Sequence, residues 1–151
     1  MNDLDAIAYA LSLAKRAAQE GEVPVGAIVV LDGRIIGEGW NQSIAHNDPT
    51  AHAEIQAIRQ AARHIGNYRL INSHLYVTLE PCTMCLGAMI HARIERLSFG
   101  ADDPKVGAVR SQAQLLAAGG FNHQIHWQGG LMAEECGDVL RQFFRQKRRV
   151  S

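Results

Sequence analysis

Four residues of the sequence can bind a metal ion or carry a proton, and they fall into two short motifs. His52 and Glu54 stand two residues apart, and Cys82 and Cys85 form a Cys-x-x-Cys motif directly after a proline. Imidazole nitrogen and thiolate sulfur are donors that Zn2+ binds tetrahedrally. The residue types therefore indicate a zinc site, provided that the fold brings the two motifs together.

Each motif stands at the start of a predicted helix. Thr50 can cap one helix that runs to about Ile65, with Gly66 behind it, and Pro81 can begin another. A helix amino terminus stabilises thiolate, the ligand form of cysteine, through its dipole and its free N–H groups. Cysteines at positions i and i+3 also share one helix face, so both can reach one ion.

Three protein ligands, His52, Cys82 and Cys85, leave the fourth position of a tetrahedral ion open, which is typical of catalytic zinc. The metalloprotease pattern H-E-x-x-H does not fit, because residue 56 is glutamine. Since residues i and i+2 do not share a helix face, we expect Glu54 beside the ion as an acid and base, not as a ligand. Zinc lowers the pKa of a bound water from ~15.7 to ~7, and a carboxylate can then take its proton.

Composition narrows the setting of this site. The 151 residues, 47% of them hydrophobic, suit a single domain over residues 1–151. An acidic amino terminus and the lack of an apolar run near ~18 residues argue against a signal peptide and a membrane anchor. Three cysteines, an odd number, favour a reducing compartment and hence the cytoplasm. The formal net charge is zero, so binding to nucleic acid needs a local patch, which the carboxyl end offers: Arg141, Arg145, Lys147, Arg148 and Arg149.

Apolar periodicity and turn residues predict the elements that must position the site. Beyond the two helices above, we expect a helix at 4–20, strands at 25–31 and 34–40 around the turn 32–33, strands at 73–80, 96–100 and 124–127, and helices at 111–117 and about 133–148. From residue 73 onward strands and helices alternate, which favours helices on both faces of a sheet. The predicted fold class is a three-layer α/β/α sandwich with a mixed five-stranded sheet.

The two motifs together resemble a known signature. H-x-E on one helix and P-C-x-x-C on the next is similar to the pattern of zinc-dependent nucleobase deaminases. The similarity to bacterial tRNA-specific adenosine deaminases covers nearly the whole chain, through EVPVGAIVV, GEGWN, DPTAHAEI, NYRLI, LYVTLEPCTMC, GAMIHARI, FGADDPK and FFRQKRR. The sequence departs from that family in the loop after the fourth strand, at Pro104, Val106 and Arg110.

The resemblance implies a cytidine deaminase-like fold, one Zn2+ per chain on the three ligands above, and a homodimer whose RNA groove uses both chains. It implies that Glu54 moves protons while water replaces the amino group at C6 of a flipped-out adenine, so that inosine forms. The implied substrate is a tRNA anticodon stem-loop, at the wobble adenosine of an arginine tRNA. Asn41 and the backbone of Ala53 would contact the base, and Asp103, Lys105 and Arg148 would hold flanking nucleotides.

Two other functions remain open at this point. A deaminase of a free base or nucleoside, such as guanine or cytosine, could use the same zinc site, but it would need neither the basic tail nor the loop 103–110. A non-enzymatic module stapled by zinc would leave Glu54 without a role. Cys136 is assigned to the core because it belongs to an apolar stripe at helical spacing: Cys136, Val139, Leu140, Phe143 and Phe144.

Overall fold

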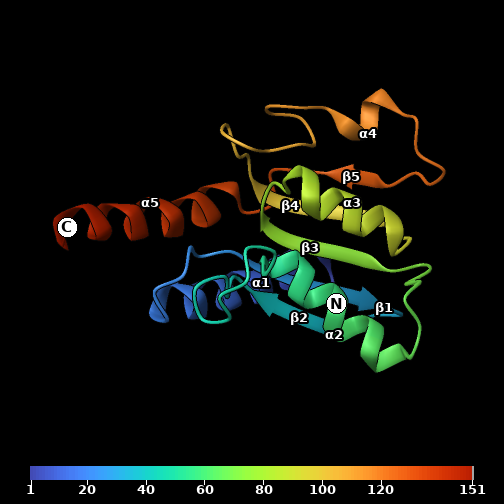
Figure 1. Ribbon diagram of the computed structural model, residues 1–151, viewed down its shortest axis with the longest axis horizontal. Helices are drawn as coiled ribbons and strands as arrows, with labels where there is room; N and C mark the ends of the chain where they lie inside the picture. The colour runs from blue at the N-terminus through green and yellow to red at the C-terminus, as the bar shows by residue number, and fades with distance from the viewer. Residues whose placement is uncertain (151) are drawn as a thin grey trace.

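The computed structural model is one mixed β-sheet with helices on both of its faces (Figure 1). It describes residues 1–150, so Ser151, the last residue of the expected domain, lies outside the described part of the chain. The strands are β1 (Gly26–Leu31), β2 (Arg34–Trp40), β3 (His74–Leu79), β4 (Arg96–Ala101) and β5 (His126–Gln128). The helices are α1 (Asp3–Gln19), α2 (Ala53–Ile65), α3 (Thr83–His91), α4 (Leu115–Ala118) and α5 (Ala133–Val150).

The sheet has the order β2-β1-β3-β4-β5, which confirms the prediction of five strands in a mixed sheet. β1 pairs antiparallel with both β2 and β3, whereas β3, β4 and β5 run parallel. The antiparallel hairpin turns at Asp32 and Gly33, whose φ angles of 51° and 75° are those that a tight two-residue hairpin requires. The two parallel crossovers are where α3 and the long segment with α4 lie.

Two apolar cores lie on opposite faces of the sheet, as the three-layer prediction requires. One core packs α2 and α3 against the sheet, and the other packs α1 and the start of α5 against its reverse face. The central strand β3 is buried at its four middle positions because it contributes side chains to both cores. Cys136, with 1% of its surface exposed, belongs to the α1 and α5 core, which confirms its assignment.

Small residues set the distance between α2 and the sheet. Gly37 and Gly39 of β2 face Ala53, Ala57 and Ala61 of α2. A Cβ atom on Gly39 would lie 2.5 Å from the Ala53 carbonyl oxygen, and one on Gly37 would lie 2.3 Å from that of Ala57. Because no side chain fits between helix and strand at these points, the backbone of β2 fixes where α2 begins.

The helices that carry the motifs begin later than the sequence indicated. α2 begins at Ala53, because Thr50 uses both its N–H and its hydroxyl to bind Asp48, at 2.8 and 2.7 Å. α3 begins at Thr83 rather than at Pro81.

The segment after β4 also differs from the prediction. α4 covers 115–118 instead of 111–117, since the N–H and hydroxyl of Ser111 donate to Glu80. The predicted strand at 124–127 is shifted to 126–128, where all three residues are exposed. In the apolar stripe of α5, Phe143 is buried but Phe144 is 44% exposed. Within residues 1–150, no helix combines the length and apolarity that crossing a bilayer would require.

Gly39→Ala is expected to destabilise the protein because its methyl group would collide with backbone atoms of α2. Overpacking of this kind costs about 1–3 kcal/mol of the free energy of unfolding. Urea denaturation of the zinc-loaded protein measures the change. Arg34→Ala, at the exposed start of the same strand, serves as the control and should change stability by less than about 0.5 kcal/mol. A Gly39→Ala variant as stable as the control would contradict the close approach of α2.

Candidate active site

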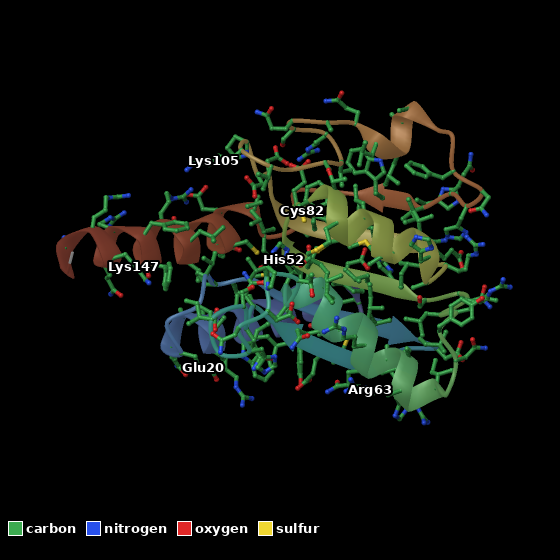
Figure 2. The ribbon with its side chains drawn as sticks, viewed as in Figure 1. Glu20, His52, Arg63, Cys82, Lys105 and Lys147 are labelled. Carbon is green, nitrogen blue, oxygen red and sulfur yellow. The ribbon has the colours of Figure 1, made fainter. Side chains whose placement is uncertain are left out.

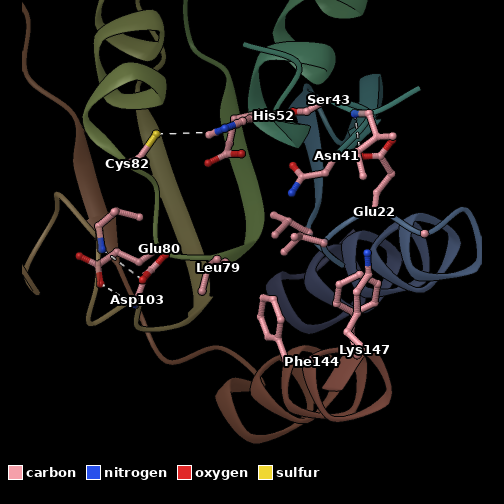
Figure 3. Close-up of a pocket in the computed structure, with 17 residues that line it drawn as sticks. Glu22, Asn41, Ser43, His52, Leu79, Glu80, Cys82, Asp103, Phe144 and Lys147 are labelled. Atoms are coloured by element: carbon pink, nitrogen blue, oxygen red, sulfur yellow. Dashed lines mark hydrogen bonds between the residues drawn. The ribbon is translucent and has the colours of Figure 1, made fainter. Parts of the chain in front are cut away.

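The two motifs meet because each places a ligand at the N-cap of a helix. His52 is the N-cap residue of α2 and Cys82 that of α3, and neither side chain forms a capping hydrogen bond. Instead, Nδ1 of His52 lies 3.7 Å from Sγ of Cys82 and 3.5 Å from Sγ of Cys85. Figures 2 and 3 show His52 and Cys82 facing one another between the two helices.

The geometry of this trio fits a zinc ion. The three candidate ligand atoms lie within 4.8 Å of one another, and two thiolates with one imidazole are a donor set that zinc prefers. Ligands held tetrahedrally at ~2.0–2.3 Å from one ion are about 3.3–3.8 Å apart, which matches the two distances above. Cys85 is buried, whereas His52 and Cys82 are half-buried, so the ion would have one side open to the solvent.

The two thiols differ strongly in acidity. The hydrogen bond from Cys85, together with the interaction with His52 and against the effect of burial, lowers the pKa of Cys82 to about 4. The hydrogen bond with Cys82, followed by burial, raises the pKa of Cys85 above its usual range. The hydrogen bond between Cys82 and His52 raises the pKa of the His52 imidazole. Without a cation, Cys82 is therefore the more acidic of the two thiols.

Glu54 is the second residue of α2 and has 4% of its surface exposed. Burial raises the pKa of its carboxyl to about 7, against the lowering effects of its own backbone N–H and of His52. A nearby divalent cation would act in the direction opposite to burial. Glu54 shares one cavity with His52 and Cys82, so a molecule bound there would meet all three side chains.

The cavity has a volume of about 400 Å3, which lies in the range of small-molecule sites. Its floor is formed by His52, Cys82 and Glu54, with Cys85 buried behind them. Its sides come from the segment between α1 and β1, the loop after β2, the end of β3, the loop after β4 and α5 (Figure 3). The side residues are Glu22, Val23, Asn41, Ser43, Ile44, Leu79, Glu80, Asp103, Val106, Phe143, Phe144 and Lys147. The walls are mostly apolar, and a few polar groups project from them.

Asn41 joins the cavity wall to the start of α2. Its Oδ1 accepts a hydrogen bond of 2.8 Å from the N–H of Ala53, so Asn41 supplies the cap that His52 does not. This leaves the amide nitrogen of Asn41 to face the cavity (Figure 3). Ala53 itself is fully buried, and its N–H is already engaged by Asn41.

The residues expected to contact flanking nucleotides lie in two places. Asp103 lines the 400 Å3 cavity, whereas Lys105 and Arg148 line a second cavity of about 610 Å3 between the loop after β4 and α5. The two cavities share Val23, Leu79, Asp103, Val106 and Phe144, so they adjoin. Arg141 and Arg145 also line the second cavity. Figure 2 shows Lys105 and Lys147 at the end of the molecule from which α5 projects.

Sequence reasoning missed two buried carboxylates in the cavity wall, Glu22 and Glu80, each only 2% exposed. Glu80 directly precedes the P-C-x-x-C motif, and this position is the one feature of the sequence that could have indicated a role for Glu80 at the site. Burial tends to raise the pKa of Glu80, but the Ser111 hydroxyl and backbone N–H donors outweigh it, so the pKa is lowered. Both carboxylates bind backbone groups of loops that are remote in sequence.

Cys82→Ser should remove zinc from the purified protein, because a hydroxyl replaces one of two thiolate ligands. Cys136→Ser is the matched control, since Cys136 lies in the core across the sheet, and it should keep one zinc per chain. Inductively coupled plasma mass spectrometry against protein concentration gives the ratio. Loss of zinc from the Cys136 variant alone would contradict the ligand assignment.

Comparisons with known proteins agree with this geometry. The sequence model of the cytidine and deoxycytidylate deaminase zinc-binding region matches residues 1–101, which include both motifs. The tRNA-specific adenosine deaminase of Haemophilus influenzae is 56% identical over 141 residues, which cover 93% of this chain and 82% of that protein.

Two solved structures extend the comparison to the fold. One comes from biochemical and structural studies of A-to-I editing by tRNA:A34 deaminases at the wobble position of transfer RNA. It superposes with a TM-score of 0.87 at 45% identity and covers 90% of this chain and 99% of that one. A guanine deaminase from Bacillus subtilis superposes with a TM-score of 0.65 at 43% identity, over 68% of this chain and 66% of that one.

The family match contains the zinc-ligand trio and Glu54, while the relative from Haemophilus influenzae aligns along nearly the whole sequence. The fold, the donor set and the comparisons therefore lead to one conclusion: this chain is a zinc-dependent deaminase of the cytidine and deoxycytidylate deaminase family and belongs, within it, to the tRNA-specific adenosine deaminases.

Proposed function

We propose that this protein converts adenosine to inosine by hydrolysis at the wobble position of a tRNA, with an arginine tRNA as the expected substrate. One observation carries the proposal: two of the three zinc ligands, His52 and Cys82, face the same cavity as the buried Glu54, and this cavity adjoins a groove lined by basic side chains. The tRNA-specific adenosine deaminase of Haemophilus influenzae and the structure from the studies of tRNA:A34 deaminases support the choice of substrate.

The chemistry at the base of the cavity divides between the metal and Glu54. Zinc, held by His52, Cys82 and Cys85, would lower the pKa of a water molecule so that hydrolysis runs at neutral pH. Glu54 takes the proton that this water loses as it adds to C6 of adenine, and delivers a proton to N1 of the ring. Glu54 then protonates the departing amino group, and ammonia leaves. Burial of Glu54 keeps the competing bulk water away from its carboxylate.

Asn41 orients the base in this scheme. Its Oδ1 is engaged by Ala53, so its amide nitrogen is the group that donates a hydrogen bond to an acceptor on the purine. The backbone of Ala53 remains a proposed neighbour of the reacting edge. Because the Asn41 side chain both caps α2 and holds the base, it would fix the position of the base relative to Glu54 on the same helix.

The groove beside the cavity suits the nucleotides that flank the edited base. Lys105 and Arg148, together with Arg141 and Arg145, line it, and Asp103 stands where the two cavities adjoin. An unpaired loop base costs less to flip out than a paired one, so a hairpin loop is the expected RNA. The net charge is zero, so affinity must come from a few local phosphate contacts.

We further propose that the protein is a homodimer and acts in the cytoplasm. The sequence of α3, TMCLGAMIH, has no Asp, Glu, Lys or Arg, and its outward face carries the partly exposed Met84, Gly87 and Ala88. An uncharged helix face of this kind is suited to a second copy of the chain. The three free cysteines, Cys82, Cys85 and Cys136, are consistent with a reducing compartment.

A deaminase of free guanine is the second candidate function, because the guanine deaminase from Bacillus subtilis shares 43% identity over the part that superposes. Such an enzyme would not need the basic groove. The two functions are separated by giving the purified enzyme an anticodon stem-loop, free adenosine, guanine and cytosine, and by measuring inosine and ammonia. Faster release of ammonia from a free base than from the stem-loop would exclude the tRNA proposal.

Glu54→Ala should keep its zinc and its folded structure. Its turnover rate on the stem-loop should fall by at least ~10²-fold, because one carboxylate serves several proton transfers. Rapid-quench assays with saturating RNA measure the rate, and metal analysis with circular dichroism provides the control. A variant that keeps more than a tenth of the wild-type rate would show that Glu54 is not the proton carrier.

Replacing Arg141, Arg145 and Lys105 together by Gln should weaken stem-loop binding and leave zinc content unchanged, because all three side chains line the groove and not the metal site. The slope of log K against log salt concentration should become shallower by about 0.7 for each phosphate that the variant no longer neutralises. Fluorescence anisotropy at several salt concentrations gives the slope. Arg34, Arg63 and Arg69, exposed outside both cavities, provide a triple Gln control with an equal change in charge. Equal slopes for the two triple variants would show that the groove does not bind the phosphates of the RNA.

A further inference from the structure

The loop after β4, residues 102–111, is folded around a single buried side chain. The carboxylate of Glu80 accepts five hydrogen bonds from this loop and is 2% exposed. Oε1 accepts from the N–H of Asp103 at 3.0 Å and from the Ser111 hydroxyl. Oε2 accepts from the N–H groups of Val109, Arg110 and Ser111 at 3.1, 2.8 and 3.0 Å.

The loop leaves no room for a different arrangement of this carboxylate. A Cβ atom on Gly107 would lie 2.4 Å from Cδ of Glu80 and 2.5 Å from its Oε1. The N–H of Ala108 donates to the carbonyl of Pro81 at 2.9 Å, which ties the loop to the residue after Glu80 as well. The loop therefore packs tightly around the start of the motif that carries Cys82 and Cys85.

A second contact closes the loop from the outside. The guanidinium of Arg110 binds Asp102 through Nε and a terminal nitrogen, both at 2.8 Å, and so joins the two ends of the loop. It also lies 5.3 Å from the ring centre of Phe99 and 5.8 Å from that of Trp127. An exposed ion pair stabilises little on its own, so the buried carboxylate is the principal anchor.

We propose that Glu80 is a positioning residue for RNA recognition: its carboxylate holds the loop so that Asp103 and Val106 form the wall shared by the catalytic cavity and the basic groove. Both side chains line both cavities, although Val106 is 58% exposed. Glu80 acts through the backbone of the loop, and the inference rests on the proposed tRNA function for the identity of the ligand.

Glu22 offers a matched comparison on the opposite wall. Its carboxylate is equally buried and accepts the N–H groups of Ile44 and Ala45 at 3.1 and 2.8 Å, in the loop after β2. The two glutamates have the same chemistry but hold different loops. Their variants should therefore release different backbone amides, which a general loss of stability would not do.

Glu80→Gln tests the proposal, because an amide offers one acceptor oxygen where the carboxylate offers two. Its oxygen can keep the three N–H groups of 109–111, and the Ser111 hydroxyl can turn to accept from the amide nitrogen, so the N–H of Asp103 is left without an acceptor. Hydrogen exchange of the Asp103 amide, followed by NMR, should become about tenfold faster, while that of 109–111 stays slow. Ile44 and Ala45 donate to different oxygens of Glu22, so in Glu22→Gln one of these two amides should exchange faster instead, and the Asp103 amide should not.

The functional measurement is affinity for the anticodon stem-loop, taken in a Glu54→Ala background so that no turnover occurs. Glu80→Gln should weaken binding about tenfold with zinc content unchanged. Gly107→Ala, which pushes the carboxylate aside, should give the same exchange and binding signature and provides the second variant if Glu80→Gln does not fold.

The outcomes separate the two proposals. If the wild-type enzyme does not deaminate the stem-loop, the tRNA function is wrong, but the exchange data still decide whether Glu80 holds the loop. If the wild type edits the stem-loop and the exchange and affinity of both loop variants equal those of the wild type, the positioning role is overturned. Fast exchange at Asp103, Val109, Arg110 and Ser111 in the wild type itself would overturn it as well.

Discussion

The structure depends on the meeting of two helix N-termini at one point beside the sheet. A residue at an N-cap normally uses its side chain to bind the free N–H groups of its own helix. His52 and Cys82 do not, because their side chains turn toward one another, 3.7 Å apart. The missing cap of α2 is supplied by Asn41 from the end of β2. The start of the helix, the ligand set and the wall of the cavity are thus a single arrangement, and a shift of α2 would alter all three.

The sheet sets that arrangement through close contacts rather than through long side chains. Gly37 and Gly39 let α2 lie directly on β2, and Gly26 does the same for α1 on β1, where a Cβ atom would lie 2.0 Å from the carbonyl oxygen of Ala10. Contacts between backbone atoms are stiff, since no rotamer can change to relieve a displacement. These backbone contacts therefore fix where the helices lie on the sheet, and the hydrogen bond from the Ala53 N–H to Asn41 holds the start of α2 in addition.

Much of this architecture could be predicted from the sequence because its signals are local. The helices show apolar periodicity over neighbouring turns, and the hairpin turn consists of the adjacent residues Asp32 and Gly33. The candidate metal ligands, His52, Cys82 and Cys85, each lie at or near the start of a helix. The predictions that failed concern features that depend on residues far away in the sequence. The N-cap of α2 was placed two residues early, at Thr50 instead of His52, because the capping side chain comes from a residue 12 positions away from Ala53. The roles of Glu22 and Glu80 were missed because a carboxylate that binds backbone groups 22 to 31 residues away leaves no pattern in the sequence.

Because Glu80 holds its loop mainly through backbone N–H groups, the sequence of the loop can vary in evolution while these hydrogen bonds remain. Its backbone partners are N–H groups at residues 103, 109, 110 and 111, and every amino acid except proline provides this donor. The shape of the loop is thus largely independent of its side chains, except at Gly107, where a Cβ atom would collide with the carboxylate, and at Ser111, whose hydroxyl donates to it. Pro104 illustrates the rule, since it stands at a position whose nitrogen the carboxylate does not use. New side chains that alter the nucleotides accepted can then arise one at a time, without first rebuilding the backbone that presents them.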